Sequence, residues 1–288
     1  MSTVITVKGK IPFMTQQKNL SPGKYYDSVA PVYDQLFLDP LSQAENKIVE
    51  NDLNRLIRRM PARGILRVLD LGCGTGLGLE LLQNVARRRR VELEYHGVDI
   101  SGEMIRIAKA QHATNGIFFY EAGMENLPEE VTGLKFDLII SLFGSFSHAE
   151  QGDSLIKHFV EDMITETGTI YLMTYSRYSV KNWFAFLKDG DFDHLSSEQQ
   201  YNIRNCGASV SCKAFFYSPG KMKKILKQVS CSCRLRFRSI NALFELPLLK
   251  KIIRKLGFLG SLRLLKAERS LLRFIPRFGH SFITIITK

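Results

Sequence analysis

VLDLGCGTGLG, residues 68–78, begins as an apolar strand and then places four glycines within seven positions. A glycine-rich turn between a strand and the following helix lets a ligand press against the backbone, because no Cβ stands in the way. The N-terminus of that helix then offers unpaired N–H groups and a partial positive charge. A tight turn alone needs one or two glycines, so four of them here predict a ligand site.

The spacing of these glycines separates two classes of nucleotide ligand. The dinucleotide fingerprint is G-x-G-x-x-G, and counted from Gly72 its third glycine would fall on Leu77. The chain instead reads D-x-G-x-G-x-G from Asp70 to Gly76. An acid before the glycines suits a cation, and S-adenosylmethionine carries an ammonium and a sulfonium but no phosphate. Asp99, at the end of the next predicted strand, can accept both hydroxyls of a ribose.

Strand and helix patterns alternate around this turn. Apolar runs predict strands at 65–71, 93–100, 117–122, 136–143 and 168–175, and helical spacing or capping predicts helices at 47–59, 77–90, 101–112, 149–165 and 218–228. Strands this apolar imply a parallel sheet covered on both faces. Two late strands, 233–240 and 280–288, predict an antiparallel edge. The insertions 176–217 and 241–279 lie outside the alternation, and such insertions usually carry specificity.

Composition bounds the class of protein. Of the 288 residues 45% are hydrophobic, which is ample for a core, and no apolar run reaches the ~18 residues of a membrane span. Residues 1–23 lack the apolar run of a secretory signal and read as a flexible leader, so we expect a cytoplasmic protein. The five cysteines include no paired CxxC units, and neither a disulfide framework nor a metal site is expected.

The formal net charge of +12 lies in two segments. Residues 1–24 contain four lysines and no acid, and residues 247–279 contain nine Lys or Arg against Glu268 alone. Four arginines at 87–90 fall on the last turn of a predicted helix, where cations are favourable, and we interpret them as a solvated helix end. Within 247–279, apolar residues recur at helical spacing opposite the basic ones. This segment either packs on its own domain as a substrate cap or makes peripheral contact with a membrane.

Taken together, these motifs resemble the class I S-adenosylmethionine-dependent methyltransferases of the small-molecule type, including quinone methyltransferases. The likeness rests on the glycine motif, DIS (99–101) with Met104, AGMENLP (122–128), FDLIIS (136–141) and the terminal strand pair. It covers about residues 45–175 and the last strand. The resemblance implies an α/β fold with a Rossmann-like, seven-stranded, mostly parallel sheet, one antiparallel strand near its edge, and helical cap insertions. A single methyltransferase domain would span 24–288, with caps at 176–217 and 241–279.

The resemblance also implies the cofactor contacts. The backbone of the glycine turn would hold the methionine moiety with help from Asp70, Asp99 would hold the ribose, and Met104 would pack on the adenine. The family often reads G-D-A-E-x-L-P after the third strand, but Gly123 stands in the Asp position here, so the adenine amino contact would come from backbone or Glu125. The expected cofactor-binding residues are Tyr33, Asp70, Gly72, Cys73, Gly74, Gly76, Asp99, Ile100, Met104, Gly123, Met124, Glu125, Ser141 and Leu142.

The acceptor is expected beside this cofactor site. KYYDSVAPVYDQLF (24–37) resembles the N-terminal lid of small-molecule members, within 24–45, and its tyrosines would either close over the cofactor or pack on the sheet edge. LFGSFSH (142–148) lacks the Asn/Asp-Pro-Pro-aromatic motif of enzymes that methylate nucleic-acid amines and glutamine side chains. The expected substrate residues are Tyr25, Tyr26, Phe143, Phe146, Tyr175, Arg177 and Trp183.

Methyl transfer requires mainly alignment of the nucleophile, exclusion of water and, in some cases, removal of a proton. His148 is the best-placed candidate base, and the alternative is a histidine that merely opens the next helix. The leading hypothesis is therefore O-, N- or C-methylation of an apolar or aromatic small molecule. An RNA methyltransferase that binds through the basic 247–279 face is the alternative. The intact Asp70, glycines and Asp99 argue against a non-enzymatic fold.

Overall fold

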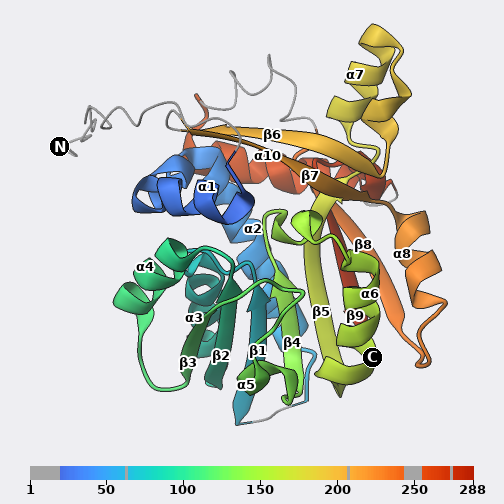
Figure 1. Cartoon of the computed structure of the whole chain (residues 1–288). Helices are drawn as coiled ribbons and strands as arrows, with labels where there is room; N and C mark the ends of the chain where they lie inside the picture. The colour runs from blue at the N-terminus through green and yellow to red at the C-terminus, as the bar shows by residue number, and fades with distance from the viewer. Residues whose placement is uncertain (1–19, 62–63, 206–207, 243–254, 273–274) are drawn as a thin grey trace.

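A twisted sheet runs through the middle of the molecule, with helices on both of its faces (Figure 1). The computed structural model describes residues 20–61, 64–205, 208–242, 255–272 and 275–288. Seven strands form the main sheet in the order β3-β2-β1-β4-β5-β9-β8, and β9 runs antiparallel to both of its neighbours. Their bounds are β1 Ile65–Leu71, β2 Glu92–Asp99, β3 Ile117–Glu121, β4 Phe136–Ser141, β5 Ile164–Ser176, β8 Arg234–Ile240 and β9 Ser281–Thr287. The predicted mostly parallel sheet with an antiparallel strand near its edge is confirmed, and two further strands, described below, bring the expected seven to nine.

Two hydrophobic clusters fill the space between sheet and helices, one on each face. On one face lie α2 (Pro40–Ile57), α3 (Leu77–Arg89), α4 (Gly102–His112) and α10 (Gly257–Leu271). On the other lie α5 (Glu129–Thr132), α6 (Gly152–His158) and α8 (Pro219–Leu226). Alternate residues of β1 feed the two clusters, with Val68 in the first and Leu69 in the second. This burial on both faces explains why the central strands are largely apolar.

Ahead of the sheet lies a short helical segment, residues 22–37, which we call the lid segment after its expected role; that role stays a prediction. It consists of α1 (Pro22–Val29) and two 3₁₀ turns, η1 (Ala30–Val32) and η2 (Asp34–Phe37). Asp39 then caps α2, because its carboxylate accepts hydrogen bonds from the backbone N–H groups of Leu41 and Ser42. The cap fixes the point at which the lid ends and the first long helix of the domain begins.

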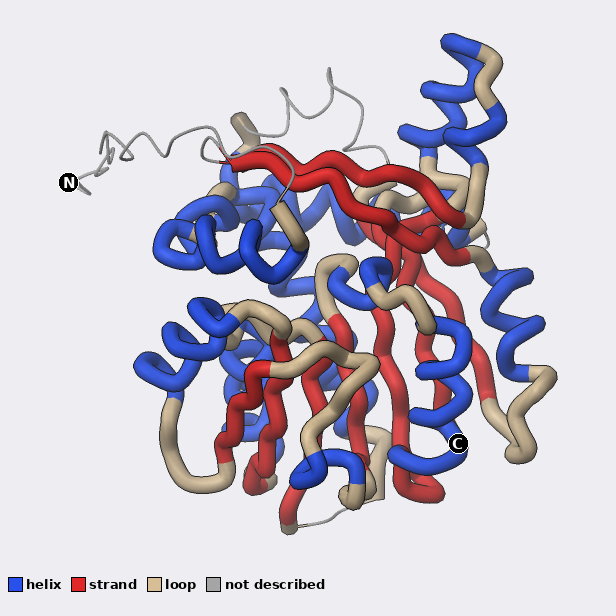
Figure 2. The backbone as a smooth tube through the Cα atoms, viewed as in Figure 1, coloured by secondary structure: helices blue, strands red, loops and turns tan. Residues whose placement is uncertain are grey.

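The insertion at 176–217 is only partly helical. It begins with α7 (Val180–Asp189) and the 3₁₀ turn η5 (Phe192–Leu195) but continues as a long hairpin of β6 (Glu198–Asn205) and β7 (Ala208–Tyr217). The alternation in 208–217 puts Ala214 and Phe216 on one face, where they are buried with Tyr175. The hairpin crosses the upper end of the sheet (Figure 2) and joins β5 only through Tyr175 and Ser176.

The helix predicted over 149–165 was too long. The structure has a 3₁₀ turn η3 (Ser145–His148), then α6, then a π-helical turn η4 (Phe159–Met163), and β5 begins at Ile164. β-Branched Ile164 and Thr165 favour a strand, and the register of β5 against β4 shifts before Thr169, so the early part of this strand is irregular. The helical spacing expected within 247–279 falls partly outside the described residues, and its described part forms α10 (Gly257–Leu271).

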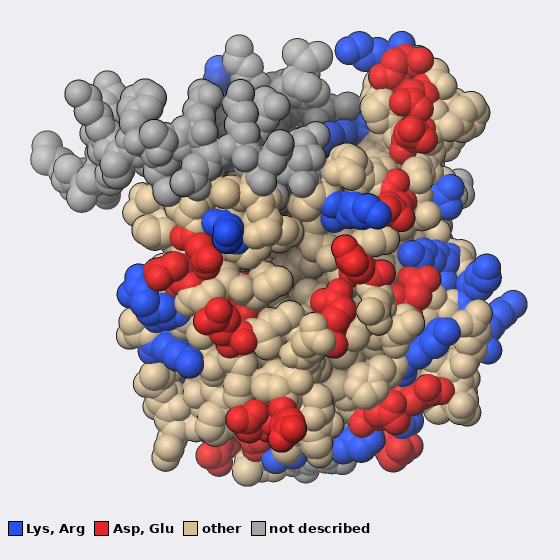
Figure 3. Space-filling model, viewed as in Figure 1, with Lys and Arg blue, Asp and Glu red and all other residues tan. Residues whose placement is uncertain are grey.

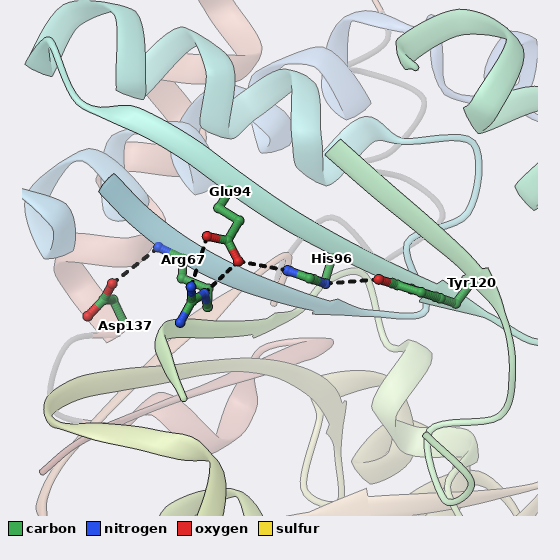
Figure 4. Close-up of polar contacts among 5 residues, drawn as sticks. All are labelled: Arg67, Glu94, His96, Tyr120 and Asp137. Carbon is green, nitrogen blue, oxygen red and sulfur yellow. Dashed lines mark hydrogen bonds and ion pairs between the residues drawn. The ribbon is translucent and has the colours of Figure 1, made fainter. Parts of the chain in front are cut away.

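A polar network crosses β1–β3 and extends to Asp137 on β4 (Figure 4), and its Tyr120 packs against the second apolar cluster. The Arg67 guanidinium donates two hydrogen bonds to Glu94, at 2.6 and 3.0 Å, and these lower the pKa of that carboxyl. The His96 ring lies between Glu94 at 3.1 Å and the Tyr120 hydroxyl at 3.2 Å, and burial lowers the pKa of its imidazole. The backbone N–H of Arg67 donates to Asp137. Cross-strand polar contacts of this kind help to fix the register of neighbouring strands.

A buried ion pair joins α10 to α2. The guanidinium of Arg269 contacts the carboxylate of Asp52, which also accepts a hydrogen bond from the Tyr171 hydroxyl at 3.3 Å. Exposed Arg55 lies 3.8 Å from the same carboxylate. Helix α10 is therefore held to the domain by this ion pair as well as by packing.

Within the described residues, no helix is long and apolar enough to cross a membrane.

Replacing Arg269 with alanine should lower the free energy of unfolding by about 3 kcal/mol, because the buried Asp52 carboxylate loses its main counterion. Arg55→Ala is the matched control, since it removes an exposed arginine from the same carboxylate and should cost less than about 1 kcal/mol. Urea unfolding followed by circular dichroism measures both. Equal losses in the two variants would contradict the assignment of the buried pair.

Candidate active site

A cleft opens at the carboxyl ends of β1–β5, the edge at which open α/β sheets bind ligands. About 970 Å³ of empty space lies within it, the open mouth included. The lid, the turn after β1, the ends of β2 and β3, the loop after β4 and the hairpin all contribute walls. The lining residues are Pro22, Tyr26, Tyr33, Gly72, Gly74, Val98, Asp99, Ile100, Met104, Ala122, Gly123, Met124, Glu125, Phe143, Gly144, Ser145, His148, Ala149, Tyr175 and Cys212.

The glycine turn forms the floor of this cleft. Gly72, Gly74 and Gly76 have φ of 76°, 55° and 108°, a region that side chains disfavour. A Cβ on Gly72 would overlap the Ser145 side chain, and one on Gly76 would overlap the His112 ring. The N–H groups of Gly72 and Cys73 donate to the Val98 carbonyl at 2.8 and 3.0 Å. Both backbone conformation and close packing therefore require these glycines.

Asp99 is fixed at the end of β2 by the backbone around it. One carboxylate oxygen accepts from the Gly74 N–H at 2.8 Å and the other from the Ser101 N–H at 2.9 Å. Burial raises the pKa of this carboxyl, and the two backbone hydrogen bonds oppose the rise. Each oxygen keeps a further lone pair, and Asp99 lines the cleft. A pair of vicinal hydroxyls can donate to these two acceptor oxygens.

Asp70 lies beneath the turn and does not line the cleft. It is 1% exposed and accepts a hydrogen bond of 2.6 Å from the Tyr95 hydroxyl. A Cβ on Gly78 would overlap its carboxylate, so the fourth glycine makes room for this acid below the first turn of α3. Burial raises the pKa of Asp70 to about 7. The acid supports the turn from behind.

Two carboxylates, Asp27 and Asp34, attach the lid segment to the elements around the cleft. Asp27 accepts from the Ser101 hydroxyl at 2.6 Å and from the Glu103 N–H at 3.2 Å. Asp34 accepts from the Thr75 hydroxyl at 2.5 Å. These pairs are 41 to 76 residues apart in the chain, and no local pattern predicts them.

Two lid tyrosines line the cleft and the third does not. The rings of Tyr26 and Tyr33 meet edge to face at 6.2 Å, and burial raises the pKa of both phenols. Tyr25 is buried beneath them, in a cluster with Val29, Ala30 and Met104. The lid tyrosines therefore divide between a wall of the cleft and the packing of the lid.

His148 is fixed between β5 and the hairpin. Its Nε2 lies 3.4 Å from the Tyr175 hydroxyl, and its Nδ1 lies 3.4 Å from the Lys213 carbonyl and 3.6 Å from the Cys212 sulfur. A carbonyl can only accept, so the proton of the neutral ring belongs on Nδ1, and the lone pair of Nε2 is directed toward Tyr175. Burial lowers the pKa of His148, which favours this neutral form.

Several residues expected at the site lie outside the cleft. Arg177 donates to the Leu195 carbonyl, Trp183 pairs with Phe186 on α7, and Phe146 packs in the core against Phe159 and Tyr217. The Ser141 hydroxyl donates to the Leu71 carbonyl. The lining of the cleft also lacks three further residues: buried Cys73, buried Leu142, and Gly76. Gly144 and Ser145, within the stretch 142–148, line the cleft. Cys212 also lines it and was not expected there; alternation in 208–217 could have placed Cys212 on a strand but not over His148.

Comparison with known proteins agrees with this geometry. Residues 68–163 match the family described as methyltransferase domain. A malonyl-[acyl-carrier protein] O-methyltransferase of Bacillus anthracis is 31% identical over 118 residues, which are 41% of this chain and 39% of the relative. An uncharacterised protein of Methanocaldococcus jannaschii is 27% identical over 210 residues, 71% of this chain and 74% of the relative. The chain thus matches about two fifths of the length of the first relative.

Solved structures share the fold across nearly the whole chain. A Haloferax volcanii methyltransferase in complex with an activator protein has a TM-score of 0.52 and 18% identity and covers 93% of this chain and 97% of its own. The plantazolicin methyltransferase BpumL in complex with SAH has a TM-score of 0.52 and 15% identity, with 93% and 91% covered. In fold over nearly its whole length, and in sequence over residues 68–163, the chain is thus similar to known methyltransferases, in agreement with the expected resemblance.

If Asp99 binds the ribose, Asp99→Ala should weaken S-adenosylmethionine binding by roughly 1–3 kcal/mol, because two hydroxyls lose a charged acceptor. Isothermal titration calorimetry measures the change. Asp153→Ala, an exposed acid outside the lining, is the control and should bind as the wild type does. Unchanged affinity in a folded Asp99→Ala protein would remove this aspartate from the cofactor site.

Asp70 should make stability depend on pH. A carboxyl whose folded pKa is raised from 3.8 to about 7 stabilises the fold below pH 4, and that contribution is lost as pH rises through 7. The free energy of unfolding of the wild type should therefore fall between pH 4 and 8 by roughly 2–4 kcal/mol more than that of Asp70→Asn. Denaturant titrations across this range test it, and parallel profiles for the two proteins would refute it.

Proposed function

We propose that this protein transfers the methyl group of S-adenosylmethionine to a small, largely apolar acceptor. The observation that carries the proposal is that the paired His148 and Tyr175 line the same cleft as the glycine turn and Asp99. In this proposal the backbone at 72–74 and Asp99 hold the cofactor. Tyr33, Met104 and the segment 123–125 enclose it, and Tyr26, Phe143 and Tyr175 contact the acceptor.

The chain's own residues would prepare the acceptor for transfer. The bound cofactor supplies an activated methyl group, so the protein must orient the nucleophile and accept its proton. The neutral His148 ring can take that proton at Nε2, either from the acceptor or through the Tyr175 hydroxyl at 3.4 Å. The Lys213 carbonyl stabilises the opposite nitrogen as a donor and thus the imidazolium that forms. A hydroxyl, an amine or an acidic C–H is compatible with such a base.

The charge of the cleft narrows the acceptor class. Within the described part of the chain, the lining includes Asp99 and Glu125 but no Lys or Arg. Acidic side chains also stand around the hollow in the space-filling view (Figure 3). An acceptor anchored by a phosphate or carboxylate would need a cationic partner, so we infer a neutral or cationic acceptor. The relatives are named for malonyl-[acyl-carrier protein] and plantazolicin, and the RNA alternative gains no support from this cleft.

His148→Ala should lower turnover by roughly 10²–10⁴, with the affinity for S-adenosylmethionine unchanged, because a general base contributes about that much. His158→Ala removes an exposed histidine of α6 and serves as the control. The assay transfers a labelled methyl group to acceptors identified by mass spectrometry of extracts incubated with the protein. If His148→Ala turns over such an acceptor as fast as the wild type does, His148 is not the base and its role is structural.

The pH dependence gives a second test of the same base. His148 must be neutral to accept a proton, and burial lowers its pKa from 6.5. The wild-type kcat should therefore decrease with an apparent pKa below 6.5 as the pH is lowered. In His148→Gln the residual kcat should not change with pH in that range, because no imidazole is left to be protonated. An acid limb retained in the variant would assign the titration to another group.

A further inference from the structure

Helix α10 has an inner face that packs on its own domain. Ser261 and Leu265 are fully buried there, and Leu265 belongs to the core cluster shared with α2 and the sheet. Glu268 accepts a hydrogen bond from the Ala242 N–H at 3.0 Å, and Arg269 forms the ion pair with Asp52. Packing on the domain thus explains which residues form the inner face of α10. It does not explain the residues on the opposite face.

The opposite face of the same helix is apolar yet exposed. Leu259 is 66% exposed and Leu271 is 75% exposed, and Leu256, Leu264 and Ile275 are at least 40% exposed. At 100° per residue, Leu256, Leu259, Leu264 and Leu271 fall on the side of α10 away from Leu265. We call these four leucines the outer leucines. A monomeric protein has little reason to leave four leucines on one helix face in water.

Cations lie among the outer leucines. Lys255, Arg263 and Lys266 are exposed, and the one acid of the helix, Glu268, lies on the buried side. The outer face thus combines three positive charges with four leucines and no acid within the described residues. In Figure 1 the helix lies at the same end of the sheet as the lid and the hairpin.

We propose that the outer face of α10 docks on an anionic lipid surface. Buried leucines and basic side chains both contribute to such binding, and each exposed Lys or Arg near an anionic surface adds roughly fivefold in affinity. RNA would be attracted by the cations but gains nothing from four exposed leucines. Because it concerns a surface outside the cleft lining, the proposal does not depend on the proposed methyl transfer.

Helix α7 shows why charge decides the assignment. It also exposes apolar side chains, Phe184 and Leu187, followed by Phe192 in η5. These lie beside exposed Asp189, Asp191 and Asp193, which an anionic lipid surface would repel. The lipid-facing assignment therefore applies to α10 and leaves α7 out.

The test is flotation of the full chain with vesicles of phosphatidylcholine alone or phosphatidylcholine with 30% phosphatidylglycerol. We expect the protein to float with the anionic vesicles at low salt, to be largely released at high salt, and to stay behind with the neutral vesicles. Arg263→Gln with Lys266→Gln should reduce the bound fraction about tenfold or more. Leu259→Ser with Leu271→Ser should reduce it severalfold.

Matched controls separate this face from charge and apolarity in general. Arg87→Gln with Arg90→Gln removes two exposed cations at the end of α3, and Leu187→Ser removes an equally exposed leucine from α7. Both controls should float like the wild type. The proposal is overturned if nothing floats, if the controls lose as much binding as the α10 variants, or if the outer leucines prove to join two copies in solution. The proposal is also overturned if the protein does not bind vesicles but binds RNA in a salt-dependent way, and if Arg263→Gln with Lys266→Gln removes that RNA binding.

Discussion

The contact between the turn after β1 and the end of β2 is the constraint on which the active site depends. The N–H groups of Gly72, Cys73 and Gly74 all point to β2, two to the Val98 carbonyl and one to the Asp99 carboxylate. The turn can approach so closely only with positive φ and without side chains. The same contact orients Asp99, fixes the start of α3 and leaves the cleft open above it. Cofactor binding, helix position and sheet geometry are thus consequences of one backbone approach.

Much of the fold could be predicted because the relevant information is local. Buried parallel strands are apolar throughout, and helices repeat at 3.6 residues, so the alternation from 65 to 175 was readable. The strand start at Ile164 was not, since a π turn and an irregular β4–β5 register leave no simple period. Asp70 was expected at the ligand, but it shares the face of β1 with Val68 and so points beneath α3.

The acceptor side of the site depends on distant contacts and was less predictable. His148 could be singled out from its position after β4, but the groups that set its proton position come from 27 and 64 or 65 residues away. The lid carboxylates Asp27 and Asp34 find their partners at similar separations. Such pairings depend on how distant segments of the chain come together in the fold. Neither the charge pattern nor the hydrophobic periodicity of the sequence predicts that. The residues expected to bind the cofactor come instead from a few short stretches that sequence patterns can locate, although burial within the turn and the strands keeps some of them out of the cleft lining.

The hairpin β6–β7 joins the main sheet at two residues of β5, yet it brings Cys212 and the Lys213 carbonyl to His148. Eight residue pairs join its two strands to each other. An exchange of this hairpin for another would thus alter the surroundings of His148 and the packing of Cys212 on the cluster of Tyr25 and Met104. Because only two of its residues pair with β5, such an exchange would leave most of the backbone pairing of the main sheet in place.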